Sequence, residues 1–550
     1  MSLGIKNKLN YFVLLSFFRN FEAEMTFELI YMAVVILMML WALMTDRLRP
    51  GLILFTAVVL LLCAGILQPK EALEGFCNKG MITVALLYLV SEGVRKSGIL
   101  ERLIYGMLPS GNVSLTKAQL RFLPLISFIS AFLNNTPVVV IFAPMIKNWA
   151  QKVKLPPTKF LIPLSYATIL GGMCTLIGTS TNLVLDGLID DAIATKMVSE
   201  GHTLGMFELS KVGVFIVLTG LFYLIMISRY LLPDRRNTLL EEADETDSPD
   251  TVRIEAMLST RFPGLGMTLR EFDFYRHYGA TVKALRRNGR PLTGDWMNEP
   301  ITRQDTLILE ADKSFMPTWG ESRVFWMLNE VGAEPELSIK KKYLALVLVM
   351  LMVMGATLGE LPFVQEWELP VKLDMFFFAA ITVVIMAWSK MFSPRKYTKL
   401  ISWDVLITIA CAFGISKGMI NSGLADFIGD YIIELAEQAR HSERGIYIIL
   451  ASLFLITNIF TEVITNNAAA ALSFPLAVSI SNKLGMDPTP FFVCICFAAS
   501  AAFSTPIGYQ TNLIVQGIGG YRFNDFIKVG LPLNIIVFLV SVYLIPVFYQ

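Results

Sequence analysis

Six long apolar runs decide what this chain can fold into. They occupy residues 27–44, 51–67, 212–227, 343–359, 445–460 and 529–549. Each is close to the roughly 20 helical residues that cross about 30 Å of hydrocarbon. Charged residues make up only 17% of the chain, whereas a soluble domain has about a quarter. The chain is therefore predicted to be an all-α polytopic membrane protein, with about eleven spans once the shorter, interrupted runs are counted.

The apolar pattern is interrupted once, between about residues 234 and 338. This polar stretch begins with an acidic linker at 234–250, which is too polar to bury itself. A small α+β domain is expected at 251–338, with strands at 251–258, 280–287 and 305–312, an amphipathic helix at 268–278, and a tight hairpin turn at Asn288-Gly289. The linker and the domain separate two membrane segments, 25–233 and 339–550.

The ends of the chain and its loops suggest an orientation. Residues 1–24 carry basic residues around a short apolar patch without a small-residue cleavage site. This pattern predicts an interfacial amphipathic segment rather than a signal peptide, with Met25 as an alternative start. The basic loop 147–159 and residues 234–340 are expected to be cytoplasmic, which places the N-terminus inside and the C-terminus outside. A net charge of +1, carried almost wholly outside the apolar runs, gives no support for a nucleic-acid partner.

One polar motif occurs twice, in register, within otherwise apolar sequence. At a spacing of 331 positions, Ser130, Asn134, Asn135, Thr136 and Pro144 align with Thr461, Thr465, Asn466, Asn467 and Pro475. A second pair follows at nearly the same spacing: LIGTSTNLVL over PIGYQTNLIV, which aligns Gly178 with Gly508 and Asn182 with Asn512. If each segment crosses the membrane an odd number of times, the two repeats are inverted and meet near the midplane.

Polar residues in such a setting predict a cavity. A buried asparagine without partners costs several kcal/mol, and irregular backbone at membrane depth survives only where protein or a polar cavity surrounds it. Pro137 suits a helix start at a hairpin tip, and Gly178 and Gly508 lie where a helix would break and resume. We therefore expect two re-entrant hairpins and two broken helices, whose free N–H groups point at an anion and whose free carbonyls point at a cation.

The paired motifs resemble the Ser-Asn-Thr signatures of the divalent anion:sodium symporter family. They appear here as Asn134-Asn135-Thr136 and Thr465-Asn466-Asn467, and Thr461-Glu462 matches the family's Thr-Glu. The resemblance implies that family's helices and re-entrant hairpins, a homodimer, and elevator-like movement of a transport domain against a scaffold.

The resemblance also implies a set of site residues. Sodium one would be held by Ser130, Asn134, Asn135 and Gly178, and sodium two by Thr461, Thr465, Asn466 and Gly508. The anion would contact Asn135, Thr136, Asn466 and Asn467. The sequence departs from the family pattern at Asn134, Thr465 and Asn467, which stand in place of Ser, Ser and Thr. Because these substitutions alter the size of the cavity, dicarboxylate selectivity does not transfer.

The polar domain resembles the TrkA-C (RCK C-terminal) domain through GMTLREFDF, the strand that ends in Arg286-Arg287, and ITRQDTLILEAD. This likeness implies a bacterial-type inner plasma membrane and a small-molecule or nucleotide regulator. The family branch with such inserts is associated with sulfate. Arg286, Arg287 and Arg290 are candidates to bind an anionic regulator; a solvated hairpin face is the alternative.

The expected function is therefore sodium-coupled symport of a divalent anion, sulfate, with about two sodium sites, no organic cofactor and no enzymatic activity. A dicarboxylate symporter of the same family is one alternative. An anion channel or sensor gated by the TrkA-C-like domain is another; it predicts a continuous polar path and no dependence on sodium. Three roles stay open. Glu462 is an intramembrane carboxylate that serves either in coupling or as a partner of helix-end amides, and Asn182 and Asn512 have no assigned role.

Overall fold

The computed structural model describes most of the chain after its first 25 residues. The predicted amphipathic segment 1–24 and nearly all of the predicted linker 234–250 lie outside the described residues. The description covers residues 26–45, 48–109, 114–199, 202–234, 251–287, 290–292, 295–303, 305–312, 314–320, 322–330, 339–359, 361, 364, 371–392, 397–437 and 445–549.

Apolar helices build the membrane part. Among the described residues, six helices are long and apolar enough to cross a membrane: Phe27–Met44, Pro69–Ser97, Lys340–Gly359, Trp403–Asn421, Gly445–Val463 and Phe523–Tyr549. Shorter apolar helices lie at Pro50–Cys63, Ser210–Met226, Met375–Trp388 and Thr489–Ser500. The chain is an integral, multi-pass membrane protein, and the total of about eleven spans stays a prediction.

The helices of the two halves follow the same order. The first half contains α2 (Phe27–Met44), α3 (Pro50–Cys63), α4 (Pro69–Glu74), α5 (Lys79–Ser97), α6 (Ile99–Met107), α7 (Leu115–Ser130), α8 (Asn135–Lys152), α9 (Leu161–Gly172), α10 (Ser180–Ala194), α11 (Ser210–Met226) and α12 (Ser228–Leu231). The second half contains α16 (Ile339–Gly359), α18 (Met375–Trp388), α19 (Tyr397–Leu400), α20 (Trp403–Asn421), α21 (Leu424–Glu437), α22 (Gly445–Val463), α23 (Asn466–Leu484), α24 (Thr489–Ser500), α25 (Gln510–Gly519) and α26 (Phe523–Tyr549).

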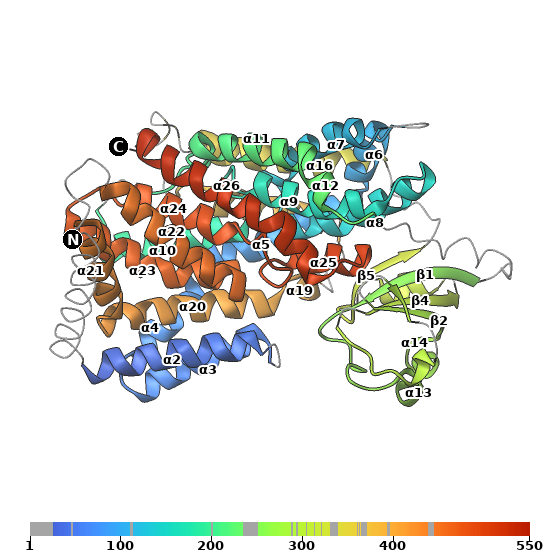
Figure 1. Ribbon diagram of the computed structural model, residues 1–550, viewed down its shortest axis with the longest axis horizontal. Helices are drawn as coiled ribbons and strands as arrows, with labels where there is room; N and C mark the ends of the chain where they lie inside the picture. Colours follow the sequence, from blue (N-terminus) through green and yellow to red (C-terminus); the bar gives the residue numbers. More distant parts are fainter. Residues whose placement is uncertain are drawn as a thin grey trace, which may run out of the picture.

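Two hairpins enter the helical body from opposite ends. The first is α7 with α8, and the second is α22 with α23. Helix α8 leads toward the end that carries the β-strands, whereas α21 and α23 lie at the other end, where the chain also finishes (Figure 1). Each hairpin contacts a helix of the other half, because α8 packs against α25 and α23 packs against α10. Which end faces the cytoplasm stays a prediction.

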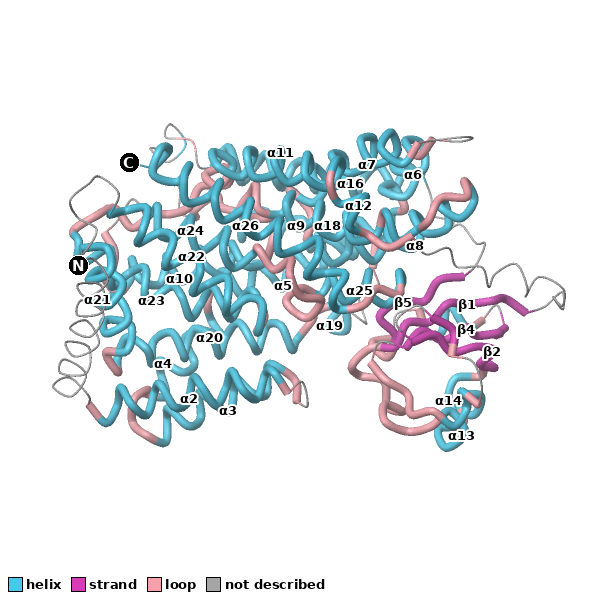
Figure 2. Tube along the Cα trace, in the orientation of Figure 1, coloured by secondary structure: helices cyan, strands magenta, loops and turns pink. Residues whose placement is uncertain are grey.

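A five-stranded antiparallel sheet forms a separate domain beside the membrane helices, drawn in magenta in Figure 2. Its strands are β1 (Thr251–Leu258), β2 (Ala280–Arg287), β3 (Arg290–Pro291), β4 (Asp305–Asp312) and β5 (Phe325–Glu330), in the order β3-β2-β4-β1-β5. The short helices α13 (Leu269–Phe272), α14 (Phe274–Tyr278) and α15 (Phe315–Trp319) accompany them. The three strands predicted from sequence are found at their predicted residues, and β5 was not predicted.

The prediction of one helix at 268–278 is wrong in one respect: the structure has two short helices there, α13 and α14. Asp273 separates α13 from α14 with a left-handed φ of 46°, and its side chain accepts a hydrogen bond from the Arg276 backbone N–H. An aspartate tolerates this conformation because its short polar side chain bonds locally to the backbone. The amphipathic pattern therefore spans a kink that turns Phe272 and Phe274 into the same aromatic core.

Two of the three arginines considered for a regulator site, Arg286 and Arg287, pair with carboxylates. Arg286 is buried and pairs with Glu255 at 3.2 Å, measured from Nη1 to Oε1. Arg287 donates from Nε to Asp305 Oδ1 at 3.0 Å and from Nη2 to Oδ2 at 3.1 Å. This hydrogen bonding raises the pKa of the Arg287 guanidinium. The solvated hairpin face that was the alternative is wrong for Arg286, while the side chain of Arg290 lies outside the described residues.

Candidate functional site

The polar motifs form the tips of the two hairpins. Helix α7 ends at Ser130 and α8 begins at Asn135, so residues 131–134 make the first tip. Helix α22 ends at Val463 and α23 begins at Asn466, which leaves two residues for the second tip. Asn135, Asn466 and Asn467 are all buried. Amides that have been removed from both water and lipid need partners, and the partners define the site.

Four oxygens surround the first tip. Ser130 Oγ donates to Asn135 Oδ1 at 2.7 Å. The same Oδ1 lies 3.2 Å from the Thr168 carbonyl oxygen and 3.3 Å from the Gly178 carbonyl oxygen. A converging set of carbonyl, amide and hydroxyl oxygens is the kind of ligand that a hard cation prefers.

The two orientations of the Asn135 amide suit different states of the site, because the protein groups alone satisfy both amide atoms only when the nitrogen faces Ser130. With its oxygen toward Ser130, it completes the oxygen cluster and donates from Nδ2 to the Tyr509 hydroxyl at 2.5 Å. In the opposite orientation its nitrogen donates to Ser130, Thr168 and Gly178, and its oxygen accepts from Tyr509. One amide can therefore serve the cluster with a cation present, and it can satisfy the same atoms without one.

The second tip repeats this arrangement. Thr461 Oγ1 lies 2.9 Å from Asn466 Oδ1 and 2.5 Å from the Ala499 carbonyl oxygen. A Cβ atom on Gly508 would lie 3.0 Å from the Thr461 carbonyl oxygen, so this glycine lies against the backbone of the residue that supplies the hydroxyl. Ala499 follows Thr168 by the same 331 positions that separate the tips. The sequence motif did not reveal these two backbone carbonyls, although their spacing could have.

Two predicted sodium ligands stand at the N-cap positions of helices. Thr465 is the N-cap of α23, and its hydroxyl accepts from the Ala468 backbone N–H at 3.4 Å. Asn134 is the N-cap of α8 and makes no side-chain cap. Among the described contacts, neither side chain reaches an oxygen cluster, and their part in sodium binding stays a prediction.

Asn182 and Asn512, which had no assigned role, bond to backbone carbonyls where the two broken helices are interrupted. The first break lies between α9 and α10, and Asn182 Nδ2 donates across it to the carbonyls of Gly172 at 3.5 Å and Thr175 at 2.9 Å. At the second break, between α24 and α25, Asn512 Nδ2 donates to the carbonyls of Ala502 at 2.9 Å and Thr505 at 3.1 Å. These bonds replace those that the helix loses where it unwinds.

Glycine is required at the first break because the backbone passes very close to itself. A Cβ atom on Gly178 would lie 2.5 Å from the Gly172 carbonyl oxygen, and one on Gly172 would lie 2.6 Å from Asn135 Oδ1. Both distances are well inside van der Waals contact. The close approach is what brings the Gly178 carbonyl beside the first tip.

Tyr509 joins the two tips. Its hydroxyl contacts Asn135 at 2.5 Å and Thr179 Oγ1 at 3.1 Å, and it also hydrogen bonds with Asn466. Sequence reasoning missed Tyr509, although it directly follows Gly508 in the second aligned pair, opposite Thr179. A phenol that touches an amide of each tip marks the point where the two repeats converge.

Further contacts connect each tip with the opposite repeat. Thr136 Oγ1 lies 3.3 Å from Gln510 Oε1. In the mirrored position, Ser180 Oγ and Thr181 Oγ1 each donate to Asn467 Oδ1 at 3.2 Å. The four residues predicted to contact the anion therefore all bond to hydroxyls or amides where the two repeats meet. Such groups bind an anion through donated hydrogen bonds, without a fixed positive charge.

Glu462 hydrogen bonds to the chain at the second break, between α24 and α25. Its Oε1 accepts from the Ser504 backbone N–H at 2.8 Å and from Asn534 Nδ2 at 2.7 Å, and its backbone carbonyl accepts from Thr505 Oγ1 at 3.2 Å. Oε2 is buried, and no described residue partners it. These bonds match the reading in which Glu462 is a partner of helix-end amides.

A substitution pair separates that anchoring role from proton coupling. We expect Glu462→Gln to keep most of the transport activity, because an amide oxygen accepts the same two hydrogen bonds. Glu462→Ala leaves two buried donors without an acceptor, at about 1–3 kcal/mol each, and should reduce transport by roughly tenfold or more. Initial uptake rates at matched protein levels measure both. An inactive Glu462→Gln protein that still folds would contradict the anchor and favour a proton carrier.

Comparison with known proteins places the chain among transporters. The model of the citrate transporter family, CitMHS, matches residues 36–482 and 367–550. An uncharacterized transporter of Synechocystis sp. is 28% identical over 96% of this chain and 98% of its own length. Two proteins of Chlamydomonas reinhardtii are also similar. A putative sulfur deprivation response regulator is 26% identical, over 90% of this chain and 98% of its own. A probable sodium/sulfate cotransporter 3 is 22% identical, over 87% and 84%.

Proposed function

The chain belongs to the citrate transporter family, and we propose that it is a sodium-coupled symporter of a divalent anion, sulfate. The observation that carries the proposal is the pair of oxygen clusters at the two tips, joined through Tyr509. Two cation sites on either side of a polar, uncharged centre are what the symport of a dianion requires. The family match agrees with the resemblance of the tips to divalent anion:sodium symporters.

The proposal assigns a ligand to each group of residues. Sodium one is bound by Ser130, Asn134, Asn135 and Gly178, together with the Thr168 carbonyl. Sodium two is bound by Thr461, Thr465, Asn466 and Gly508, together with the Ala499 carbonyl. The anion contacts Asn135, Thr136, Asn466 and Asn467, with Tyr509 between the tips.

Electrostatics gives the reason for coupling. Moving a dianion into a cell that is 100 mV negative inside costs roughly 4.6 kcal/mol, at about 2.3 kcal/mol per charge. Two sodium ions that travel with it cancel this cost. The tips contain no lysine or arginine, so the compensating charge comes from bound cations and from helix ends that point at the anion.

Sulfate is favoured over a dicarboxylate by one comparison, because a relative that matches most of this chain is named a probable sodium/sulfate cotransporter. The family description, citrate transporter, supports a dicarboxylate or related organic anion as the second candidate. Competition experiments distinguish the two.

The packing of the helices suggests which of them move together during transport. We assign the hairpins and broken helices, α7–α11 and α22–α26, to a transport domain that moves as an elevator. The scaffold consists of α2–α5 and α16–α20. The packing of α8 on α25 and of α10 on α23 supports this grouping, because it joins the two tips into one body. The proposal includes a homodimer in which two scaffolds meet.

Uptake into proteoliposomes tests the proposal. Radiolabelled sulfate should accumulate when sodium is higher outside and should not accumulate when potassium replaces sodium. Excess unlabelled citrate or succinate should compete weakly. Accumulation that ignores sodium would overturn the coupling and favour the channel, whereas strong competition by succinate would move the substrate to a dicarboxylate.

A further inference from the structure

The five-stranded domain contacts the membrane part in two separate places. One contact is with α8, the second arm of the first hairpin, and with its neighbour α25, and the other is near the start of α20. We propose that the domain is a latch that fastens the hairpin to the scaffold in the conformation described here. This inference rests on the proposed movement of the hairpin against the scaffold.

The contact with α8 is a buried group of three charges. Lys147 Nζ lies 2.9 Å from Glu255 Oε1 on β1, and Arg286 Nη1 on β2 lies 3.2 Å from the same oxygen. The side chains of Lys147, Glu255 and Arg286 are only 3%, 11% and 9% exposed. Lys147 lies on the helix that begins at Asn135, so the contact is rigidly connected to the first tip.

The charges of this group depend on one another. Burial alone would raise the pKa of Glu255, but Lys147 and Arg286 outweigh burial and lower it. A carboxylate with a lowered pKa contributes stability above its unfolded pKa and loses that contribution as the pH falls through the folded value. At neutral pH the contact is therefore fully formed, and removing the carboxylate would leave two buried cations without a counter-charge.

The sheet is built to dock on this face. Along β1, Ile254, Ala256 and Leu258 face the core of the domain, while Met257 and Met327 pack with the hydrophobic core of the membrane part. Alternating side chains of a strand point to opposite faces. Glu255 and Met257 thus lie on the face that meets the membrane helices.

The second contact joins the domain to the scaffold. Arg323, just before β5, donates from Nη2 to the carbonyl oxygens of Thr398 at 2.5 Å and Ile401 at 3.0 Å. Thr398 lies on α19 and Ile401 just before α20. Arg261 lies within electrostatic reach of Arg49 and Asp404, at the starts of α3 and α20.

A domain held at both places resists movement between them. The chain enters the domain after α12 and leaves it before α16, so the domain also lies between the two groups in sequence. If α8 moves relative to α20, a rigid sheet cannot keep both contacts. Either the buried contact at α8 or the Arg323 contact near α20 must then break in each transport cycle, and the weaker of the two sets how firmly the protein rests in this conformation.

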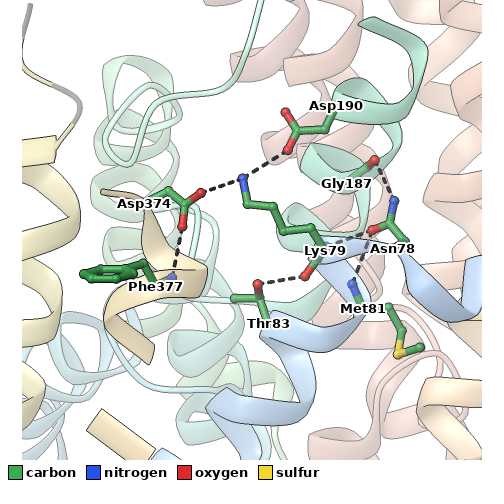
Figure 3. Close-up of polar contacts among 9 residues, drawn as sticks. Asn78, Lys79, Met81, Thr83, Gly187, Asp190, Asp374 and Phe377 are labelled. Atoms are coloured by element: carbon green, nitrogen blue, oxygen red, sulfur yellow. Dashed lines mark hydrogen bonds and ion pairs between the residues drawn. The ribbon is translucent and has the colours of Figure 1, made fainter. Parts of the chain in front are cut away.

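The other end of the molecule offers a reporter of this conformation. There Lys79, at the start of α5, pairs with Asp190 of α10 at 3.2 Å and with Asp374, the N-cap of α18, at 2.9 Å (Figure 3). Asn78 Nδ2 also donates to the Gly187 carbonyl of α10 at 2.9 Å. Cysteines at positions 79 and 190 should therefore be joined by a short bifunctional thiol reagent while the hairpin body rests against the scaffold.

The test measures this cross-link in membranes that contain the full chain, with Cys63 and Cys77 replaced by alanine. Glu255→Lys places three cations together, and the expected result is cross-linking slowed by roughly tenfold or more. Lys147→Glu combined with Glu255→Lys restores opposite charges across the interface and should restore the rate. Glu299→Lys is the matched control, because it reverses an exposed carboxylate of the same domain, which pairs with Arg287 at 3.6 Å; it should leave the rate unchanged.

An unchanged cross-linking rate in a folded Glu255→Lys protein would overturn the latch. If that variant is not recovered, Arg323→Ala weakens the scaffold contact instead and should slow cross-linking in the same way; no change there would also overturn the latch. The readout needs neither sodium nor sulfate. If uptake depends on sodium but Glu255→Lys leaves the cross-linking rate unchanged, only the latch is contradicted. If Glu255→Lys slows cross-linking but uptake does not depend on sodium, only the proposed coupling is contradicted.

Discussion

Sodium-driven sulfate uptake is expected to fall by roughly 100-fold or more when Asn135 is replaced with alanine. This side chain contributes to the first oxygen cluster and also bonds to Tyr509. Each lost bond that leaves a buried partner costs about 1–3 kcal/mol, and about 1.4 kcal/mol is a factor of ten. Initial uptake rates over a range of sodium concentrations measure the loss. Asn466→Ala should have a similar effect, because Asn466 holds the mirrored place.

The matched control is Asn421→Ala. Asn421 ends α20 and bonds to the Ile66 carbonyl and to Glu71, away from both tips. Its loss should leave uptake within about twofold, since a partly exposed bond of this kind contributes about 1 kcal/mol or less to stability. If Asn135→Ala and Asn421→Ala behaved alike, the tip would not be the binding site.

Asn135→Asp separates the cation from the anion. A carboxylate oxygen suits a cation at least as well as an amide oxygen does, but its negative charge repels a dianion. Sodium binding, measured by protection against thermal unfolding, should persist while sulfate uptake is lost. Loss of both would mean that the amide acts only as a structural link.

Gly178→Ala is expected to abolish uptake. The added methyl group would meet the Gly172 carbonyl oxygen at 2.5 Å. Because the atom that the methyl group meets belongs to the backbone, no side-chain rotation relieves the clash. Overpacking of this kind lowers the free energy of unfolding by about 1–3 kcal/mol or more. The first break must widen, which moves the Gly178 carbonyl away from Asn135. Uptake and sodium protection should both fall.

Substitutions of two further glycines, Gly106 and Gly508, serve as controls for the effect of Gly178→Ala on uptake. Gly106→Ala, on α6, would meet no atom within 4 Å and should leave uptake unchanged. Gly508→Ala would meet Ala502 Cβ and the Thr461 carbonyl oxygen at 3.0 Å, a milder contact. Its effect should therefore be smaller than that of Gly178→Ala. Equal losses at both positions would contradict the spacing argument.

Much of this architecture could be read from the sequence, because its signals are periodic or repeated. Long apolar runs predicted the membrane helices, and the stretch DTLILEAD at 305–312 predicted β4. The 331-residue repeat led to the tips, since side chains that must be buried together, such as Ser130 with Asn135, recur as a set.

Other features left no such signal. The carbonyls of Thr168 and Ala499 are backbone atoms, which any residue supplies. Tyr509 acts through a partner 374 positions away, and only the fold brings the two together. The kink at Asp273 depends on a local side-chain bond that competes with an amphipathic pattern. The basic loop predicted at 147–159 is wrong for its first six residues, which belong to α8. Lys147 gave no signal of its role, because its partner Glu255 lies on another domain.

The bond between Asn135 and Tyr509 has a consequence for biogenesis. The ribosome completes the first hairpin long before it reaches residue 509, so in the nascent chain the Asn135 amide has its partners in the first half, such as Ser130, but lacks the Tyr509 hydroxyl. A product that ended after the first repeat would lack Tyr509 and the second tip. It could not assemble the pocket, and lipid tails offer the Asn135 amide no hydrogen-bond partner in place of Tyr509. The pocket of this protein can therefore be completed only in the last part of translation.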